Sequence, residues 1–416
     1  MHRTLPFLGL TGLLLGTAAA LPASASVLDV GTAAAPHRRP AVAPLVIAHR
    51  GASGYRPEHT LEAYRLAIRM GADFIEPDLV STRDGVLVAR HENEISGTTN
   101  VASQPQFASR RVTKAIDGVP VSGWFTEDFT LAELKTLRAV ERLPAVRPQN
   151  TVFDGRFQVP TLQEIIDLAV AESRRLHRTI GLYPETKHPS YFASIGLSLE
   201  EPLVRTLHRN GLRHRHDAVF IQSFETANLR RLSRMTELPL VQLIDAAGRP
   251  YDFTAAGDQR TYADLVKRAG LKEISRYADG IGTNKNVLIP RDADGRLTAP
   301  TTVVRDAHAA GLLVHAWTFR AENQFLPADL RIGADPYARG DITTEYELFL
   351  QLGLDGVFSD QPDTAVAARA ARALTRGHAS PASAPASPHP GGALHWNAGA
   401  VSAGAERLQR STGVLR

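Results

Sequence analysis

The segment Val46-Ile47-Ala48-His49-Arg50-Gly51 is an apolar run that ends in two polar residues and a glycine. A second apolar run, Phe74-Ile75, leads directly into Glu76-Pro77-Asp78. Both are typical of buried strands that end in chemically active side chains. In a parallel barrel the carboxyl ends of all strands face the active site, so we expect these side chains to meet at one mouth of a barrel.

One local pattern recurs through the chain: a helix-like segment ends in glycine, and a strand-like run follows shortly. The pattern occurs at Gly71, Gly211, Gly270, Gly311 and Gly353. Glycine tolerates the left-handed conformation that closes the carboxyl end of a helix. Helix starts agree, since Thr161 and Glu164 have the spacing of a capping box. Strands that alternate with helices indicate a parallel sheet covered by helices.

The chain contains nine candidate strands, one more than an eight-stranded barrel needs. They are residues 45–49, 73–79, 86–90, 179–185, 218–223, 239–244, 279–283, 312–318 and 355–359. The weakest is 239–244, but 86–90 could instead pair locally through the turn Arg83-Asp84-Gly85. The pattern breaks between about 92 and 160, where a polar, irregular stretch indicates a large insertion in one strand-to-helix loop. The expected fold class is α/β, a (β/α)8 TIM barrel with a large insertion in one βα loop.

The amino-terminal residues 1–25 have the features of a secretory signal peptide. A short positive start is followed by the apolar run Leu5–Leu21 and by the small residues Ala23-Ser24-Ala25. An uncleaved membrane anchor is the alternative, although small residues dominate the end of the run and no basic stop follows directly. We therefore expect an extracytoplasmic protein, secreted or periplasmic, with no stable membrane insertion after cleavage.

The two segments that flank the folded body are expected to lack a core. Residues 26–43 are rich in Ala and Pro and are interpreted as a flexible leader. Residues 376–416 form an Ala/Pro/Ser-rich tail that is expected to be disordered, because such a composition cannot bury enough apolar surface. The folded domain is expected at 44–375, and its share of hydrophobic residues is sufficient for one barrel.

Composition excludes several classes of chemistry. The chain has no cysteine, which excludes thiolate metal sites, cysteine nucleophiles and disulfides. Its net charge of +4 comes without a basic block, which argues against nucleic acid as a partner and fits an anionic small molecule. There is no Gly-x-Ser-x-Gly elbow and no Walker-type phosphate loop.

Carboxylates follow two of the predicted strands. Glu76 and Asp78 are two residues apart, so both point to one face of a strand, and two acids inside a barrel are costly unless paired or metal-bound. Glu185 and Lys187 repeat this spacing at the end of another strand. Oxygen ligands select a hard cation such as Mg²⁺ or Ca²⁺. Solvated acids on an exposed strand and a surface ion pair are the simpler alternatives.

Two histidines and an arginine complete the set at the predicted strand ends. His49 and His91 can exchange protons near neutral pH, and Arg50 can hold a phosphate with its planar fork. Lys187 can neutralise a phosphate oxygen. A cation with basic side chains for charge, and two histidines for acid and base, suits metal-assisted phosphoryl transfer.

These residues lie in motifs that resemble those of the glycerophosphodiester phosphodiesterase family, and in detail its exported bacterial branch. The resemblance covers about residues 44–370, through His49-Arg50-Gly51-Ala52-Ser53-Gly54-Tyr55, Pro57-Glu58-His59-Thr60, Glu76-Pro77-Asp78, Thr82-Arg83-Asp84-Gly85, His91, Pro184-Glu185-Thr186-Lys187, Gln222-Ser223-Phe224, Ala278-Asp279-Gly280-Ile281-Gly282, His315-Ala316-Trp317-Thr318 and Gly356-Val357-Phe358-Ser359-Asp360-Gln361-Pro362-Asp363. Two positions depart from the usual family pattern. His59 stands where Asn is usual, although the exported branch often has His, and Glu92 stands where Asp is usual.

The resemblance implies a metal centre and an acid–base pair. Glu76, Asp78 and Glu185 would bind one divalent cation, Ca²⁺ in the exported branch and otherwise Mg²⁺. His49 and His91 would be the general acid and base, in an order that the sequence leaves open.

The resemblance also implies the substrate contacts and the reaction. Arg50 would contact the phosphate, Glu58 would lie in or beside the site, Lys187 would add positive charge, and Trp317 would line the pocket. The implied reaction hydrolyses a glycerophosphodiester to glycerol 3-phosphate and an alcohol. Alternatives are an exohydrolase of glycerol-phosphate polymers such as teichoic acid, a phospholipase D-like enzyme, and a non-catalytic surface binding protein on a barrel. The alcohol head group and the oligomeric state stay open.

Overall fold

The computed structural model describes residues 43–378. The predictions for residues 1–25, for 26–42 and for 379–416 therefore lie outside the described residues. Within 43–378, no helix combines the length and the apolar character needed to cross a membrane.

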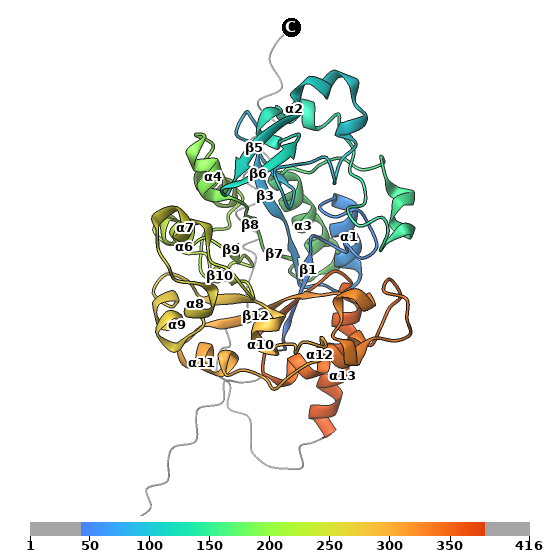
Figure 1. Cartoon of the computed structure of the whole chain (residues 1–416), viewed down its shortest axis with the longest axis vertical. Coiled ribbons are helices and arrows are strands. Elements are labelled where there is room, and N and C mark those ends of the chain that lie inside the picture. Colours follow the sequence, from blue (N-terminus) through green and yellow to red (C-terminus); the bar gives the residue numbers. More distant parts are fainter. Residues whose placement is uncertain (1–42, 379–416) are drawn as a thin grey trace, which may run out of the picture. The chain divides into compact units, whose positions relative to one another are not determined.

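Eight strand positions, each parallel to its neighbours, close into a ring (Figure 1). In order around the barrel they are β1 (Leu45–His49), β2 with β3 (Phe74–Glu76, Asp78–Ser81), β7 with β8 (Gly181–Leu182, Glu185–Thr186), β9 (Ile221–Ser223), β10 (Leu240–Ile244), β11 (Gly280–Asn284), β12 (Leu313–Phe319) and β13 (Gly356–Ser359). Two positions are interrupted at Pro77 and Pro184, where the backbone has no N–H for the ladder. The predicted TIM-barrel fold is confirmed.

The excess ninth strand candidate is a local hairpin strand. Residues 86–90 contain β4 (Leu87–Ala89), which pairs antiparallel with β3 through the turn Arg83-Asp84-Gly85. The segment 239–244, the weakest candidate, contains the barrel strand β10. The sequence pattern did not distinguish the hairpin strand β4 from the barrel strands, because β4 is as fully buried as they are and has the same kind of apolar run.

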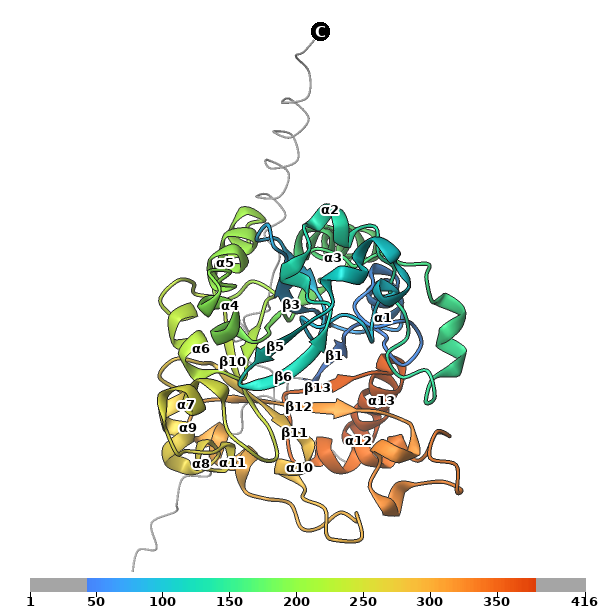
Figure 2. The same cartoon turned by 45° about the horizontal axis from the view of Figure 1, so that its top comes forward.

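A helix follows each barrel strand and covers its outer face (Figures 1 and 2). The helices are α1 (Leu61–Arg69), α2 (Leu131–Leu134), α3 (Leu162–Leu176), α4 (Pro189–Ser194), α5 (Glu200–Arg209), α6 (Thr226–Leu232), α7 (Tyr251–Ala256), α8 (Tyr262–Leu265), α9 (Arg268–Ile274), α10 (Lys285–Leu288), α11 (Val303–Ala309), α12 (Ile342–Gln351) and α13 (Pro362–His378). Thr161 and Glu164 form the capping box of α3, as their spacing predicts.

Residues 90–161, between β4 and α3, form what we call the inserted segment. It contains α2, several 3-10 turns and a hairpin of β5 (Val112–Ile116) and β6 (Val119–Gly123) that is separate from the barrel sheet. The hairpin turns at Asp117-Gly118, both with positive φ. A Cβ added to Gly118 would lie 3.8 Å from the ring of Tyr251 at the start of α7. The hairpin therefore reaches from the α2 side of the barrel mouth to α7 (Figure 2).

The interior of the barrel is filled by an aromatic cluster. Its members are Ile47, Phe74, Tyr183, Ala218, Phe220, Val241 and Phe358. Tyr183 stacks on Phe220 with ring centroids 5.1 Å apart, and its hydroxyl lies 2.6 Å from Nδ1 of His315. Phe358 also forms part of the wall of the pocket at the mouth, so this cluster separates that pocket from the opposite end of the barrel.

The turn after β1 depends on Gly51. Its φ is +84°, and an added Cβ would lie 2.7 Å from the backbone carbon of Ala63 in α1. Gly85 has a similar φ of +76° but open space around it. We expect Gly85→Ala to cost about 1–2 kcal/mol of unfolding free energy for its conformation alone, and Gly51→Ala roughly 2–5 kcal/mol because the clash adds to it. Denaturant unfolding measures both variants, and equal losses would contradict the steric argument.

Candidate active site

A pocket of about 330 Å³ opens at the carboxyl ends of the strands. Six of the predicted site residues line it: His49, Arg50, Glu76, His91, Glu185 and Trp317. The other three, Glu58, Asp78 and Lys187, are buried and contact lining residues. Glu58 and Asp78 lie 3.1 and 3.4 Å from the Arg50 guanidinium, and Lys187 Nζ lies 3.0 Å from Oε1 of Glu185. The structure therefore brings all nine predicted side chains together.

Three buried carboxylates converge at one point of this pocket. Glu76, Asp78 and Glu185 each offer an oxygen, and these oxygens lie within 4.8 Å of one another. Burial and the neighbouring carboxylates raise the pKa of Glu76 well above its usual range and that of Glu185 to about 8. For Asp78, burial raises the pKa, but His59 and Arg50 outweigh it and hold the pKa well below its usual range.

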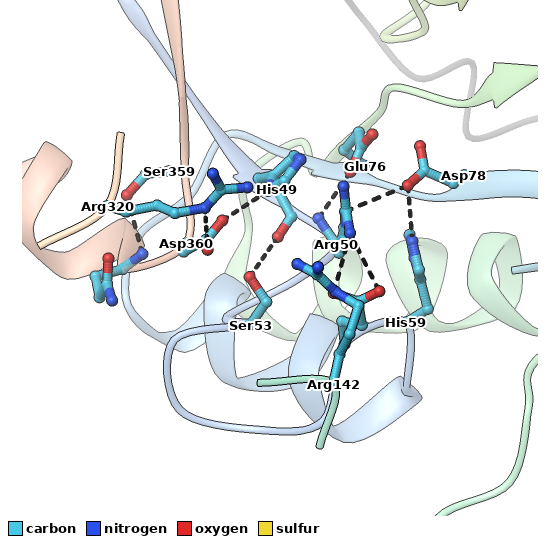
Figure 3. A network of polar contacts seen from close by, with 12 residues as sticks. His49, Arg50, Ser53, His59, Glu76, Asp78, Arg142, Arg320, Ser359 and Asp360 are labelled. Atoms are coloured by element: carbon cyan, nitrogen blue, oxygen red, sulfur yellow. Dashed lines mark hydrogen bonds and ion pairs between the residues drawn. The ribbon is translucent and has the colours of Figure 1, made fainter. Parts of the chain in front are cut away.

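The same carboxylates fit a hard cation. Oδ1 of Asp78 is buried and has no hydrogen-bond partner among residues 43–378, so its acceptor capacity is unused. One oxygen of Asp78 and one of Glu76 are held by hydrogen-bond donors. Oδ2 of Asp78 accepts from His59 Nε2 at 2.9 Å, and Oε2 of Glu76 accepts from the Arg50 backbone N–H at 2.7 Å (Figure 3). A cation at this point would satisfy the free oxygen and offset the mutual repulsion. These three residues can hold a divalent metal ion.

His59 belongs to the support of this group. Its Nδ1 lies 2.8 Å from the Tyr64 hydroxyl, and its Nε2 lies 2.9 Å from Asp78. Both ring nitrogens are thus engaged, so the imidazole is fixed in one orientation between α1 and β3. His59, one of the two residues that depart from the pattern described above, thus contacts the predicted metal ligand Asp78 directly.

His49 is oriented by a carboxylate of the last strand. Its Nδ1 lies 2.6 Å from Oδ1 of Asp360, which directly follows β13 (Figure 3). Because a carboxylate only accepts, Nδ1 carries the proton and Nε2 keeps a free lone pair. Burial, together with Arg50, lowers the pKa of His49 to about 4. Oδ2 of Asp360 accepts from Arg147 and Arg320 at 2.6 and 2.8 Å, so the carboxylate stays charged and fixed.

His91, which also lines the pocket, has a matching arrangement. Its Nδ1 lies 2.8 Å from Oε1 of Glu92, and its Nε2 lies 3.4 Å from Nζ of Lys187. Burial, with the positive charges of Arg50 and Lys187, lowers the pKa of His91 to about 3. Each histidine is therefore neutral near pH 7 with Nδ1 on a carboxylate, and Nε2 of His91 lies within hydrogen-bond distance of Lys187.

Arg50 and Glu58 form a buried ion pair behind the histidines. Nη1 of Arg50 donates to both carboxylate oxygens of Glu58, at 3.2 and 3.1 Å, and Nε of Arg142 donates to Oε2 at 2.7 Å. Burial opposes the charge of Arg50, but Glu58 and Asp78 outweigh it and raise the pKa of Arg50. The guanidinium is thus a permanent positive charge at the edge of the pocket.

Sequence reasoning assigned no role to several residues that the structure places at the site. They are Asp360, Arg147, Arg320, Gln222 and His188. Asp360 and Gln222 lie at or just after the carboxyl end of a barrel strand, and that position was a usable signal. Arg147 lies in the inserted segment and has no such signal.

Comparison with known proteins gives a consistent result. The model of the glycerophosphoryl diester phosphodiesterase family matches residues 49–364. The chain is 38% identical to glycerophosphodiester phosphodiesterase GDPD6 of Arabidopsis thaliana, over 76% of this chain and 83% of the relative, and 31% identical to a Bacillus subtilis glycerophosphodiester phosphodiesterase, over 77% and 84%. A solved structure from Silicibacter pomeroyi shares the fold with a TM-score of 0.55 at 20% identity, over 80% of this chain and 95% of that one. An Oleispira antarctica phosphodiesterase, solved with the product sn-glycerol-3-phosphate, has a TM-score of 0.50 at 21% identity, over 78% and 96%.

Proposed function

The chain belongs to the glycerophosphoryl diester phosphodiesterase family, and we propose that its pocket cleaves glycerophosphodiesters with one divalent cation and a pair of histidines. The reaction is hydrolysis to glycerol 3-phosphate and an alcohol, and it is supported by three relatives that are named glycerophosphodiester phosphodiesterases. The product bound to the Oleispira antarctica phosphodiesterase supports the same substrate class. The observation that carries the mechanism is a triad of buried carboxylates within 4.8 Å, flanked by two neutral, carboxylate-bound histidines.

Glu76, Asp78 and Glu185 would hold the cation, for which we propose Ca²⁺, with Mg²⁺ as the alternative. An oxygen-only ligand set favours these hard ions over zinc or copper. When bound, the cation supplies positive charge to the non-bridging phosphate oxygens. Lys187 and Arg50 add fixed positive charge on the same side of the pocket, where negative charge grows in the transition state.

His49 and His91 would exchange the protons. One Nε2 takes the proton of the attacking hydroxyl as its oxygen bonds to phosphorus. The other histidine, neutral in the free site, takes up a proton when the anionic phosphodiester binds, and it gives that proton to the leaving alkoxide as the phosphorus–oxygen bond breaks. Asp360 and Glu92 keep the two rings in the required tautomer. The attacking hydroxyl belongs to water or to the neighbouring glycerol carbon, and the latter route gives a cyclic phosphate that water then opens.

Trp317 forms one wall of the pocket for the alcohol part of the substrate. Its Nε1 donates to the Gly282 carbonyl at 2.8 Å, which fixes the indole plane. The ring of Phe224 packs edge-on against it at 5.7 Å between centroids. Two rigid aromatic faces thus flank the entrance to the phosphate site.

A coupled assay of glycerol 3-phosphate release from glycerophosphocholine tests this proposal. We expect release with Ca²⁺ or Mg²⁺, loss of release with excess chelator, and recovery when the ion is restored. The metal dependence follows because the three carboxylates repel one another without a cation. Release that persists in chelator after extensive dialysis would contradict the metal centre, and absence of release with every cation would contradict the substrate.

A further inference from the structure

Both proposed catalytic histidines are held, through their carboxylates, by residues of the inserted segment. On the His49 side, Arg147 reaches Asp360 directly, with Nη2 2.6 Å from Oδ2. On the His91 side, the connection is longer and ends at Asp117 at the tip of the β5–β6 hairpin. The second connection runs through three contacts, two of which join residues that are far apart in the sequence.

The chain of contacts from His91 is continuous. His91 Nδ1 lies 2.8 Å from Oε1 of Glu92, and the other oxygen of Glu92 lies 2.8 Å from Nε2 of His188. Nδ1 of His188 lies 2.7 Å from Oδ2 of Asp117. With a carboxylate on each ring nitrogen, His188 donates from both and carries a positive charge. Beyond His91, negative and positive side chains therefore alternate along this series of contacts: Glu92, His188 and Asp117.

The geometry of Asp117 and His188 is unusual for ordinary side chains. Both lie in the left-handed region, with φ of 49° and 46°. Neither is glycine, so each conformation is held by its surroundings. Burial lowers the pKa of His188, but its hydrogen bonds to Asp117 and Glu92 outweigh burial and raise the pKa to about 9. The second oxygen of Asp117 is buried and has no hydrogen-bond partner in the part of the chain that the structure describes, so this carboxylate loses solvation while it holds His188.

The hairpin has contacts besides the one that Asp117 makes at its tip. Lys114 on β5 lies 2.9 Å from Oε1 of Glu127 and 2.8 Å from Oδ1 of Asp128. The Thr113 and Ser122 hydroxyls are 2.6 Å apart across the two strands. These contacts, with the ladder itself, anchor the hairpin near its base. The contact between Asp117 and His188 is therefore not the only one that holds the hairpin within the described residues, and we ask what else it does.

We propose that Asp117 is a positioning residue for the reaction: by holding His188 it fixes Glu92, and through Glu92 the tautomer and orientation of His91. The inference rests on the proposed role of His91. It makes the hairpin tip a part of the active site although Asp117 contacts neither the substrate pocket nor the metal ligands.

Asp117→Asn is the decisive variant, because Asn tolerates the left-handed conformation and removes only the charge. We expect kcat for glycerophosphocholine to fall about 10-fold, within the range found for the partners of site residues, while KM changes by less than about 2-fold. Val119→Ala on the same hairpin is the matched control, because its side chain is 60% exposed, and it should keep the wild-type kcat. A near-normal kcat in Asp117→Asn would overturn the proposal.

The pH profile separates positioning from simple loss of structure. A raised pKa means that the charge of His188 is present below about pH 9 and is lost as the pH rises through it. His188 faces Glu92 and Asp117 as partners and Lys187 as a like charge, and Glu225 adds a further acid near Asp117. Without the Asp117 charge, the alkaline decline of kcat should begin at lower pH. A uniform loss of kcat with an unmoved profile would show a structural role and reject the proposal.

Two further variants show whether a negative result contradicts the proposed role of His91 or the positioning role of Asp117. His91→Ala is measured in parallel: if it keeps activity, the proposed function of His91 fails, whereas an inactive His91→Ala beside a normal Asp117→Asn rejects the positioning inference alone. In a Glu92→Gln background, Asp117→Asn should add less than about 2-fold, because the path to His91 is already broken. Full additivity of the two changes would contradict action through Glu92.

Discussion

His49→Ala is expected to lower kcat for glycerophosphocholine by about 10²- to 10⁴-fold, and His91→Ala by a similar factor, which is the contribution of a positioned general acid or base. Both residues line the pocket, and each ring has its Nδ1 on a carboxylate. Neither variant removes a ligand of the predicted cation. Metal binding and thermal stability should therefore stay near wild type while turnover is lost.

The leaving group distinguishes the acid from the base. A p-nitrophenyl diester of glycerol phosphate has a leaving group that departs without protonation, so the variant that lacks the acid should regain much of its rate on it, and the variant that lacks the base should not. His214→Ala is a suitable control, since its side chain is 69% exposed and remote from the pocket lining. Near-normal turnover of glycerophosphocholine by either pocket variant would remove that histidine from the mechanism.

The site residues that the sequence could predict are those that lie at the ends of predicted strands. His49, Glu76 and Glu185 each close an apolar run, and parallel barrel strands necessarily bring such ends to one mouth. The two-residue spacing of Glu76 and Asp78 accounts for two members of the carboxylate triad, and the third, Glu185, lies beside Asp78 where β8 pairs with β3. Which of the nine candidates form the eight barrel strands was not predictable in the same way, because the buried hairpin strand β4 has the same pattern.

The support of the histidines could not be predicted from local pattern. Arg147 and Asp360 are separated by 213 residues, and His188 and Asp117 by 71, so no periodicity links the partners. Arg147 and Asp117 also lie in the irregular inserted segment, where neither strand nor helix spacing assigns a direction to a side chain. Only the folded chain shows that this segment completes the hydrogen-bond networks of both histidines.

Glu185→Gln is expected to abolish the effect of Ca²⁺ on stability and to lower kcat/KM at least about 10²-fold. In the wild type without metal, burial and Asp78 raise the pKa of Glu185 to about 8. A raised folded-state pKa means that its stabilisation is complete below the ordinary range near pH 4.5 and is lost as the pH rises toward 8. Metal-free wild type should thus lose unfolding free energy over this window, and Glu185→Gln should lose less of it.

Added cation should restore the unfolding free energy that the metal-free wild type loses as the pH rises. A ligand at 100 times its Kd stabilises the folded state by about 2.7 kcal/mol, so the wild-type Tm at pH 8 should rise with Ca²⁺. Glu225→Gln is the matched control, because Glu225 is also buried and its pKa is raised to about 7, yet it lies outside the triad. That variant should keep the full Ca²⁺ response. A Ca²⁺ response retained by Glu185→Gln, or lost equally by Glu225→Gln, would show that the cation binds elsewhere than at the three carboxylates.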